Sequence, residues 1–596
     1  MSGANTLDLD SILVEDRLAT QIAEHYQTWN DAKRTVVERW KEIYAYVNAT
    51  DTRMTSNSSL PWKNTTTIPK LCQIRDNLYA NYMATIFPKR KWMNWEGAAA
   101  DEELKTKKNA IEDYMYYAVD RTEFKSETEK QLLDYIDTGN TFCMPVWYDN
   151  MQDSEDGTLK TGYVGPGMRR ISPYDIVFNP LATSFYQTPK IIREIKSLGE
   201  VKEMVTRMNK NEDTQLGDDL WEYIKGIRYH ATNYPETDSD KDFKIRIDGY
   251  GSYWEYLNSD YVEVLTFYGD IYDKEEDLFY RNYKIVVVDR HKVVMQKPNP
   301  SLLPFPPIFH SGWRKRPDNL WAMGPLDNLV GMQYRIDHLE NLKADVFDLI
   351  AFPPLKIKGY VEDFEWGPFE KIFVGDDGDV DTLSPDVQAL NADVQIANLM
   401  ALMEEMAGAP KEAMGFRTPG EKTKYEVQRL ENAASRIFQS KIAQFEEEII
   451  EPCLNAMLEL ARRNMSSSTI RAFDSENQAA IFQTLTAVDV TGQGRLRPVA
   501  ARHFVEQAQI VQNLTNFANS PLGQDEGIKM HISGIEMARL FEELLEVRDR
   551  KLVTPYIRIT EQAEATRIAQ GQQESLMMEQ TTPSGLTPDD YDAELQ

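Results

Sequence analysis

Hydrophobic positions in the N-terminal part of the chain recur at helical spacing. Between Ile12 and Val47, apolar and aromatic side chains fall three or four residues apart, which predicts one long amphipathic helix. Further helices are predicted over residues 68–86, 102–117 and 125–136. The last of these ends at Gly139-Asn140, because both residue types tolerate the left-handed backbone that commonly closes a helix.

After residue 140 the pattern changes to short apolar runs separated by Gly, Pro and Asp, which is typical of strands. Strands are predicted over residues 142–148, 163–164, 169–171, 175–178, 244–247, 261–270, 283–289 and 292–296. Two helices, over residues 199–208 and 218–227, interrupt this series, and the proline-rich residues 297–307 are expected to be extended. The mixture of helical and strand-rich parts predicts an α+β fold.

The most distinctive pattern follows, from Leu320 to Ala461. Two predicted helices, 320–350 and 386–406, flank a short acidic segment with strands at 355–357 and 371–374. Gly324-Pro325 is expected to open the first helix, since proline suits a first helical turn. Between Pro353 and Asp386 there are nine carboxylates and three lysines, and the second helix carries four carboxylates and no basic residue.

Carboxylates are therefore the candidate functional groups of this helix–ribbon–helix unit, although charge alone is equally consistent with an ordinary solvated hairpin. The candidates are Glu362, Asp363, Glu365, Asp376, Asp377, Asp379, Asp381, Asp386, Asp393, Glu404 and Glu405.

A basic loop over residues 409–424 follows the acidic unit. Its cations stand among Gly, Pro and Ala, with only Glu412 and Glu421 opposing them, which suits transient contact with phosphates. They are Lys411, Arg417, Lys422 and Lys424. A long amphipathic helix is predicted from Tyr425 to Arg462, with a kink at Pro452. Beyond it we expect a strand over 482–490, helices over 499–518, 535–547 and 554–569, and a disordered tail from residue 571.

Composition narrows the function classes. The 596 residues suffice for several domains, and the formal net charge of −29 argues against a protein that grips DNA on a basic surface. It allows a protein that encloses DNA without sticking to it, because carboxylates repel phosphates. The three cysteines form no CxxC pair, which fits a reducing compartment without a disulfide framework or zinc site. We expect no signal peptide and no membrane span.

Motifs for catalysis or cofactor binding fail on inspection. Gly415–Thr423 resembles a phosphate-binding loop, but Glu421 stands where its lysine belongs and no buried strand precedes it. Asp377-x-Asp379-x-Asp381 lacks the glycine and glutamate of a calcium loop, so an acidic turn is preferred. Gly492-Gln-Gly494 resembles part of a dinucleotide-binding motif, but a tight turn explains it better. There is no HExxH or GxSxG. We predict no enzyme activity, no cofactor and no metal.

The order of these features resembles the portal protein of tailed bacteriophages, of the short-tailed type. The resemblance covers most of the chain and depends on an ordered set of short segments. These are residues 137–142, 171–180, 262–270, 299–300, 304–306 with Trp313, 324–327, 333–337 with Asp345, and 353–354.

The resemblance implies a ring, usually of twelve subunits, at one capsid vertex. By position it assigns residues 1–319 to a wing, 320–350 and 386–408 to two stem helices, 351–385 to a clip, 409–424 to a tunnel loop, 425–524 to the returning wing, 525–570 to a crown and 571–596 to an acidic tail. It implies a non-enzymatic conduit for double-stranded DNA during packaging and ejection. Its expected partners are the terminase, tail adaptors, capsid and scaffolding proteins, in the virion and earlier in the host cytoplasm.

Two alternatives stay open. In the first, the chain is another structural virion protein, such as an adaptor, although its length and its mixture of helices and strands disfavour this. A nucleotide-dependent packaging enzyme would need a Walker lysine and an acidic partner borne on a strand, and neither is evident.

Overall fold

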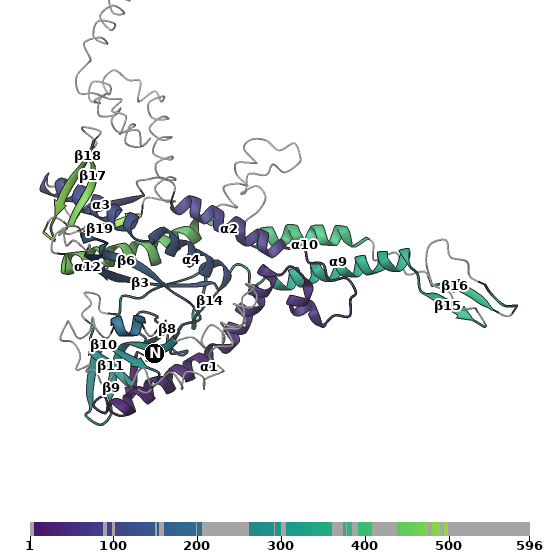
Figure 1. The fold of residues 1–596 in the computed structure, drawn as a ribbon, viewed down its shortest axis with the longest axis horizontal. Coiled ribbons are helices and arrows are strands. Elements are labelled where there is room, and N and C mark those ends of the chain that lie inside the picture. Colours follow the sequence, from purple (N-terminus) through teal and green to yellow (C-terminus); the bar gives the residue numbers. More distant parts are fainter. Residues whose placement is uncertain are drawn as a thin grey trace, which may run out of the picture. The chain divides into compact units, whose positions relative to one another are not determined.

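The structure, a computed structural model, is shown in Figure 1. It describes residues 5–87, 92–97, 102–149, 152–153, 160–197, 199–204, 261–290, 292–299, 305–359, 373–376, 378–383, 391–407, 438–465, 468–474, 479–488, 490 and 494–498. The chain divides into two compact units, Met1–Phe473 with Ala480–Arg502 and Asp474–Ala479 with His503–Gln596. Nearly all described residues belong to the first unit. Its helices and separate sheets make the fold α+β, as predicted.

The predicted N-terminal helices are confirmed. They are α1 (Glu15–Asn48), α2 (Lys70–Ile86), α3 (Glu102–Arg121) and α4 (Phe124–Asp137), with the short 3₁₀ turns η1 (Thr52–Met54) and η2 (Ser56–Ser59) after α1. Helix α1 joins three hydrophobic clusters along its length, because its apolar stripe is continuous. Ile22 packs in the first cluster, Trp40 in the second, and Tyr46 in the third and largest.

The largest sheet has six strands. Its order is β11 (Lys292–Pro298), β10 (Leu278–Val288), β9 (Tyr261–Asp273), β8 (Lys190–Ser197) and β7 (Ile176–Phe178), and β1 (Thr6–Leu9) also pairs with β9. One edge of β9 is shared, since β8 pairs with residues 261–268 and β1 runs parallel to residues 270–273. Gly269 separates the two stretches at φ +153°, where a side chain would collide with Pro189.

A second sheet supports the region from which the helix–ribbon–helix unit starts. It consists of β12 (Phe309–Gly312), β3 (Asn140–Asp149) and β6 (Val164–Ile171). Smaller pairs are β13 (Arg314–Arg316) with β14 (Asn319–Met323), β2 (Met93–Gly97) with β19 (Gly494–Pro498), β4 (Gln152–Asp153) with β5 (Lys160–Thr161), and β17 (Ser468–Asp474) with β18 (Ala479–Leu485). Helices α4 and α12 (Glu451–Asn464) pack on β3 and β6.

The helix–ribbon–helix unit is a two-helix hairpin. Helix α9 (Val330–Ala351) and helix α10 (Ala392–Met406) lie side by side, and the ribbon of β15 (Leu355–Lys358) and β16 (Asp379–Thr382) lies beyond their far ends (Figure 1). The ribbon is antiparallel, with Leu355 opposite Thr382 and Lys358 opposite Asp379. We call α9, the ribbon and α10 together the hairpin.

Two predictions about this region need correction, and a third is only partly covered by the described residues. The first helix begins at Val330 rather than at Gly324-Pro325, because residues 319–323 are held extended in β14 and buried Leu326 and Leu329 belong to the turns that follow. The partner of β15 is β16, so Asp379 and Asp381 stand in a strand rather than in an acidic turn. Of the predicted strand 371–374, residues 371–372 lie outside the described residues.

Of the long helix predicted from Tyr425, the structure describes the part from Phe438 onward. This part departs from a regular α-helix close to Pro452, where a kink was predicted. A π-helical turn, η6 (Glu446–Ile450), precedes Pro452 in α12. Proline has no N–H to bond the carbonyl four residues earlier, that of Glu448, and a widened turn accommodates the missing bond. The predicted strand 244–247, helix 218–227, basic loop and C-terminal helices and tail lie outside the described residues.

Candidate functional site

The hairpin leaves large apolar side chains exposed to solvent. Its buried face holds Ile336, Leu339, Ile396 and Met403 against the rest of the unit. On the other faces and the ribbon, the exposed apolar residues are Leu342, Phe347, Leu349, Ile350, Phe352, Ile357, Phe373, Val374, Leu383, Val394, Leu402 and Met406. Soluble monomers rarely carry so many neighbouring apolar side chains in water, so this exposed apolar face is typical of a protein interface.

The described acidic candidates divide into two groups. Asp379 and Asp381 on the ribbon and Asp376, just before it, are exposed, as are Asp393 and Glu405 on α10. Asp393 lies in the first turn of α10, where a carboxylate is favourable, and bonds Lys343 of α9 at 2.7 Å. Glu362, Asp363, Glu365, Asp377 and Asp386 lie outside the described residues, as do the basic loop residues Lys411, Arg417, Lys422 and Lys424.

Glu404 differs from the other candidates because it is buried. Its carboxylate forms an ion pair with Lys70 of α2, and both side chains are less than a tenth exposed. Lys70 also donates to Gln73 Oε1 at 2.9 Å. Glu404 therefore fixes α10 to the N-terminal helices instead of contributing to an acidic surface.

A row of polar side chains on α9 holds the chain segment that precedes α2. Gln333, Asp337, Asn341 and Asp345 stand four residues apart, so they share one face of the helix. They bond the backbone of residues 63–71, which are extended up to the start of α2. We call this set of contacts the ladder. It was not predicted from the sequence, where its signal is the four-residue spacing of amides and carboxylates along this helix.

Each rung of the ladder is a short hydrogen bond to a main-chain group. Asp345 accepts from the N–H of Asn64 (2.9 Å), and Asn341 accepts from the N–H of Thr66 (2.8 Å) and donates to its carbonyl (2.7 Å). Asp337 accepts from the N–H of Ile68 at 3.0 Å. The remaining rungs join Gln333 to the carbonyl of Ile68 (2.6 Å) and to the N–H of Leu71 (3.0 Å). Each contributes about 0.5–1.5 kcal/mol, and loss of a partner costs more.

Burial raises the pKa of the Asp337 carboxyl to about 6, although the N–H of Ile68, the hydroxyl of Thr67 and the amide of Gln333 oppose this shift by stabilising the anion. The unfolded chain releases this proton near pH 4, about two units lower. The folded protein therefore holds the proton more tightly, and stability falls as pH rises from about 4 to about 6.

Asp337→Asn is expected to remove this pH dependence, because an amide keeps the acceptor for Ile68 and never ionises. The variant should gain stability relative to the wild type as pH rises from about 4 to 6, with a constant difference above pH 7. Thermal melts at closely spaced pH values measure this. Asp379→Asn, on the exposed ribbon, is the matched control. If the difference in stability between the wild type and Asp337→Asn does not change with pH, the Asp337 carboxyl does not cause the pH dependence.

A close backbone approach holds the start of the hairpin against α4 and β3. Gly139 has φ +71°, and a Cβ there would collide with the backbone of Met323 and Gly324. Next to it, Asn140 accepts from the N–H of Ala322 (2.9 Å) and donates to its carbonyl (3.0 Å), so its side chain bonds β14 as a neighbouring strand would.

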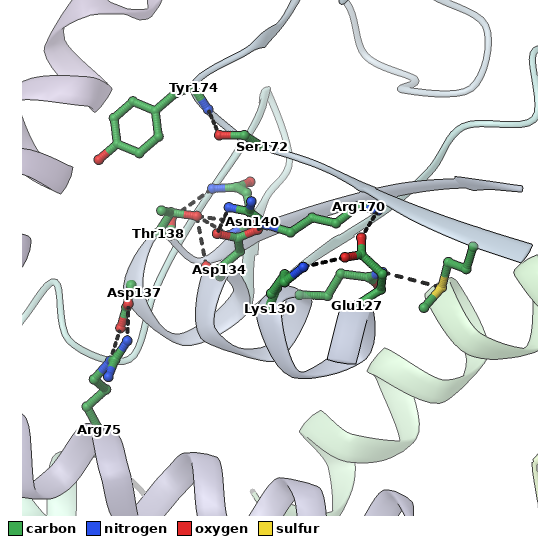
Figure 2. Close-up of polar contacts among 12 residues, drawn as sticks. Arg75, Glu127, Lys130, Asp134, Asp137, Thr138, Asn140, Arg170, Ser172 and Tyr174 are labelled. Atoms are coloured by element: carbon green, nitrogen blue, oxygen red, sulfur yellow. Dashed lines mark hydrogen bonds and ion pairs between the residues drawn. The ribbon is translucent and has the colours of Figure 1, made fainter. Parts of the chain in front are cut away.

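Ion pairs fix α4 on both sides of this approach (Figure 2). Asp137, the last residue of α4, receives two bonds from Arg75 of α2, at 2.8 and 2.9 Å. Asp134 binds Arg170 of β6, and Glu127 accepts from the backbone N–H of the same arginine at 2.8 Å. Paired guanidinium–carboxylate contacts of this kind have directional geometry. They position α4 rather than provide a reactive group.

Comparison of the sequence with protein families and with curated proteins finds no match. The function therefore has to be argued from the residues themselves.

The described residues of this site present exposed surfaces or hold helices in position. Among the described residues, no group of three His, Cys, Asp or Glu is placed to hold a metal ion. None of the helices in the described ranges is both long and apolar enough to cross a membrane. His338 packs against Trp62, with ring centroids 4.9 Å apart, and burial lowers its pKa. The hairpin, with its exposed apolar face and acidic ribbon, is the candidate functional feature that the described residues show.

Proposed function

We propose that the chain is the portal protein of a tailed bacteriophage, one subunit of a ring at a capsid vertex. The hairpin carries this proposal. It has two antiparallel helices, a small acidic ribbon beyond them and an apolar face that one chain leaves uncovered. These correspond to the stem helices and clip that the resemblance assigns to residues 320–408.

In this proposal, neighbouring copies cover the exposed apolar face and leave a channel between them. A ring with twelve subunits would carry a large negative charge, since each copy has a net charge of −29. Carboxylates that face the channel repel phosphates, so the duplex stays centred and slides. The ribbon is the docking site for the terminase during packaging and for tail adaptors afterwards. The wing meets capsid and scaffolding proteins.

Electron microscopy of the purified full-length chain tests the proposal directly. Annular particles are the expected result, and a sample without rings at any salt concentration would contradict it. A parallel ATPase assay separates the conduit from a nucleotide-driven enzyme. The conduit requires no ATP turnover by the chain alone.

Alanine substitution of the basic loop is expected to lower DNA packaging or retention while rings still form. The loop cations would make brief phosphate contacts whose strength falls with salt, so their loss should also weaken the salt dependence of DNA retention. The variant replaces Lys411, Arg417, Lys422 and Lys424. Packaged DNA per particle is the measurement.

A matched variant controls for charge. It removes four exposed cations from the N-terminal part of the chain, at Arg17, Arg34, Arg53 and Lys125. This control should package DNA normally. Equal packaging by both variants and the wild type would exclude a role for the loop.

A further inference from the structure

The contacts between α9 and residues 63–68 have a regular register. Moving four residues along α9, from Asp345 to Asn341 to Asp337, moves the contact two residues along the segment, from Asn64 to Thr66 to Ile68. Four helical residues rise about 6 Å and two extended residues rise about 6.7 Å, so the two repeats match over several rungs. The segment therefore runs antiparallel to α9 along its polar face.

The opposite side of the segment is also held. Thr65 lies between two rungs, and its groups bond the turn that follows α1. Its carbonyl accepts from the N–H of Thr52 at 3.1 Å, and its hydroxyl donates to Asp51 at 3.1 Å. The segment is thus fixed between α9 and the turn that follows α1.

Helix α9 has no built-in bending point along the ladder. After Gly331, near its start, the helix contains neither glycine nor proline, and sharp bends usually need one of these or an irregular turn. Any change in the angle of the hairpin therefore has to occur at its attachments. The attachments to the N-terminal part include the apolar contacts of the buried face and the packing of His338 on Trp62. The polar attachments are the ladder and the Lys70–Glu404 pair, and both involve residues 63–71.

We infer that residues 63–68 are a strap that locks the hairpin to α1 and α2 and thereby sets the angle of the hairpin. The rungs bond main-chain groups, so the lock depends on the register and conformation of the strap. The side chains of Asn64 and Thr67 add hydrogen bonds to Asp345 (2.8 Å) and Asp337 (3.0 Å). The inference concerns one chain and does not depend on the proposed function.

Asn341→Leu tests the strap from the helix side, because leucine fits a helix but can bond neither the N–H nor the carbonyl of Thr66. Thr66→Pro tests it from the strap side, since proline removes the N–H that Asn341 accepts and leaves α9 unchanged. Arg335→Leu, on the exposed side of the same helix, is the matched control.

Two measurements on the full-length chain decide the matter. Hydrogen exchange reports whether the strap is held, and each strap variant should raise exchange of the amides at residues 64–68 at least tenfold. Pulsed electron paramagnetic resonance reports the hairpin angle through spin labels at Arg34→Cys and Lys358→Cys. Cys72→Ser removes the partly exposed thiol, while Cys143 and Cys453 are buried. Excess unlabelled chain ensures that distances arise within one copy.

The wild type and Arg335→Leu should share one narrow distance distribution, and both strap variants should broaden or shift it. Fast exchange of the strap with an unchanged distribution would show that the strap does not set the angle. Unchanged exchange would show that the ladder does not hold the strap. If Asn341→Leu fails to fold, as judged by circular dichroism, Thr66→Pro decides alone, because it leaves the helix sequence intact.

Discussion

Replacing Phe347 and Ile350 together with serine is expected to dissociate the proposed ring into folded single chains. Both side chains are exposed on α9, at 52% and 43%, so their replacement leaves the core of the single chain unchanged. Burying the exposed half of each side chain at an interface contributes about 0.8–1.5 kcal/mol. Loss of two such contacts weakens each subunit interface by roughly 10- to 200-fold. Sedimentation or light scattering over a range of concentrations measures the change.

A double substitution of the same kind elsewhere is the control. Leu181 and Val488 are more exposed, at 75% and 71%, but neither lies on the hairpin. Serine at both positions should leave assembly unchanged. If both variants assemble like the wild type, the exposed apolar face of the hairpin is not the subunit interface.

Lys70→Met is expected to destabilise the unit by about 3–5 kcal/mol. Methionine fills a similar volume but leaves the Glu404 carboxylate buried without its cation, and an uncompensated buried charge is strongly unfavourable. The double variant Lys70→Met with Glu404→Leu should recover most of the loss, because an apolar pair of similar volume removes the charge from the core. Chemical denaturation measures the loss of unfolding free energy. Hydrogen exchange of amides near the hairpin shows whether the loss is local.

An exposed ion pair between the two hairpin helices is the matched comparison. Lys343→Met breaks the contact with Asp393, whose side chain is 72% exposed, and should cost less than about 1 kcal/mol. Equal effects of Lys70→Met and Lys343→Met would show that burial of the Lys70–Glu404 pair is not what makes it important.

Much of the fold follows from hydrophobic spacing, and the failures have specific causes. Helix α1 was predictable because its apolar stripe is continuous, whereas β8 was missed because charged residues occupy its buried positions. Lys190 there donates to the carbonyl of Thr188 at 2.8 Å, and Arg193 bonds Glu263 at 2.6 Å. A pattern of apolar and polar residues assigns such side chains to the solvent-facing side, although hydrogen bonds within the fold satisfy their buried charges.

The candidate site shows the same division. The order helix, ribbon, helix was predictable from local periodicity and from Pro353-Pro354. The ladder was not, since its rungs join residues about 270 positions apart and the strap has no regular secondary structure of its own. Glu404 counted as a surface carboxylate because nothing near it in sequence indicates Lys70 as its partner. Local spacing therefore predicts the hairpin, whereas its attachments require the three-dimensional structure.

The short strand β1 has a practical consequence for protein production. It covers the part of the β9 edge beyond Gly269, where β8 no longer pairs. Deleting the first ten residues would leave backbone N–H and C=O groups of residues 270–273 unpaired, so that a strand of another molecule could pair with them. The truncated protein should aggregate through edge-to-edge strand pairing, although no residue of the hairpin is altered.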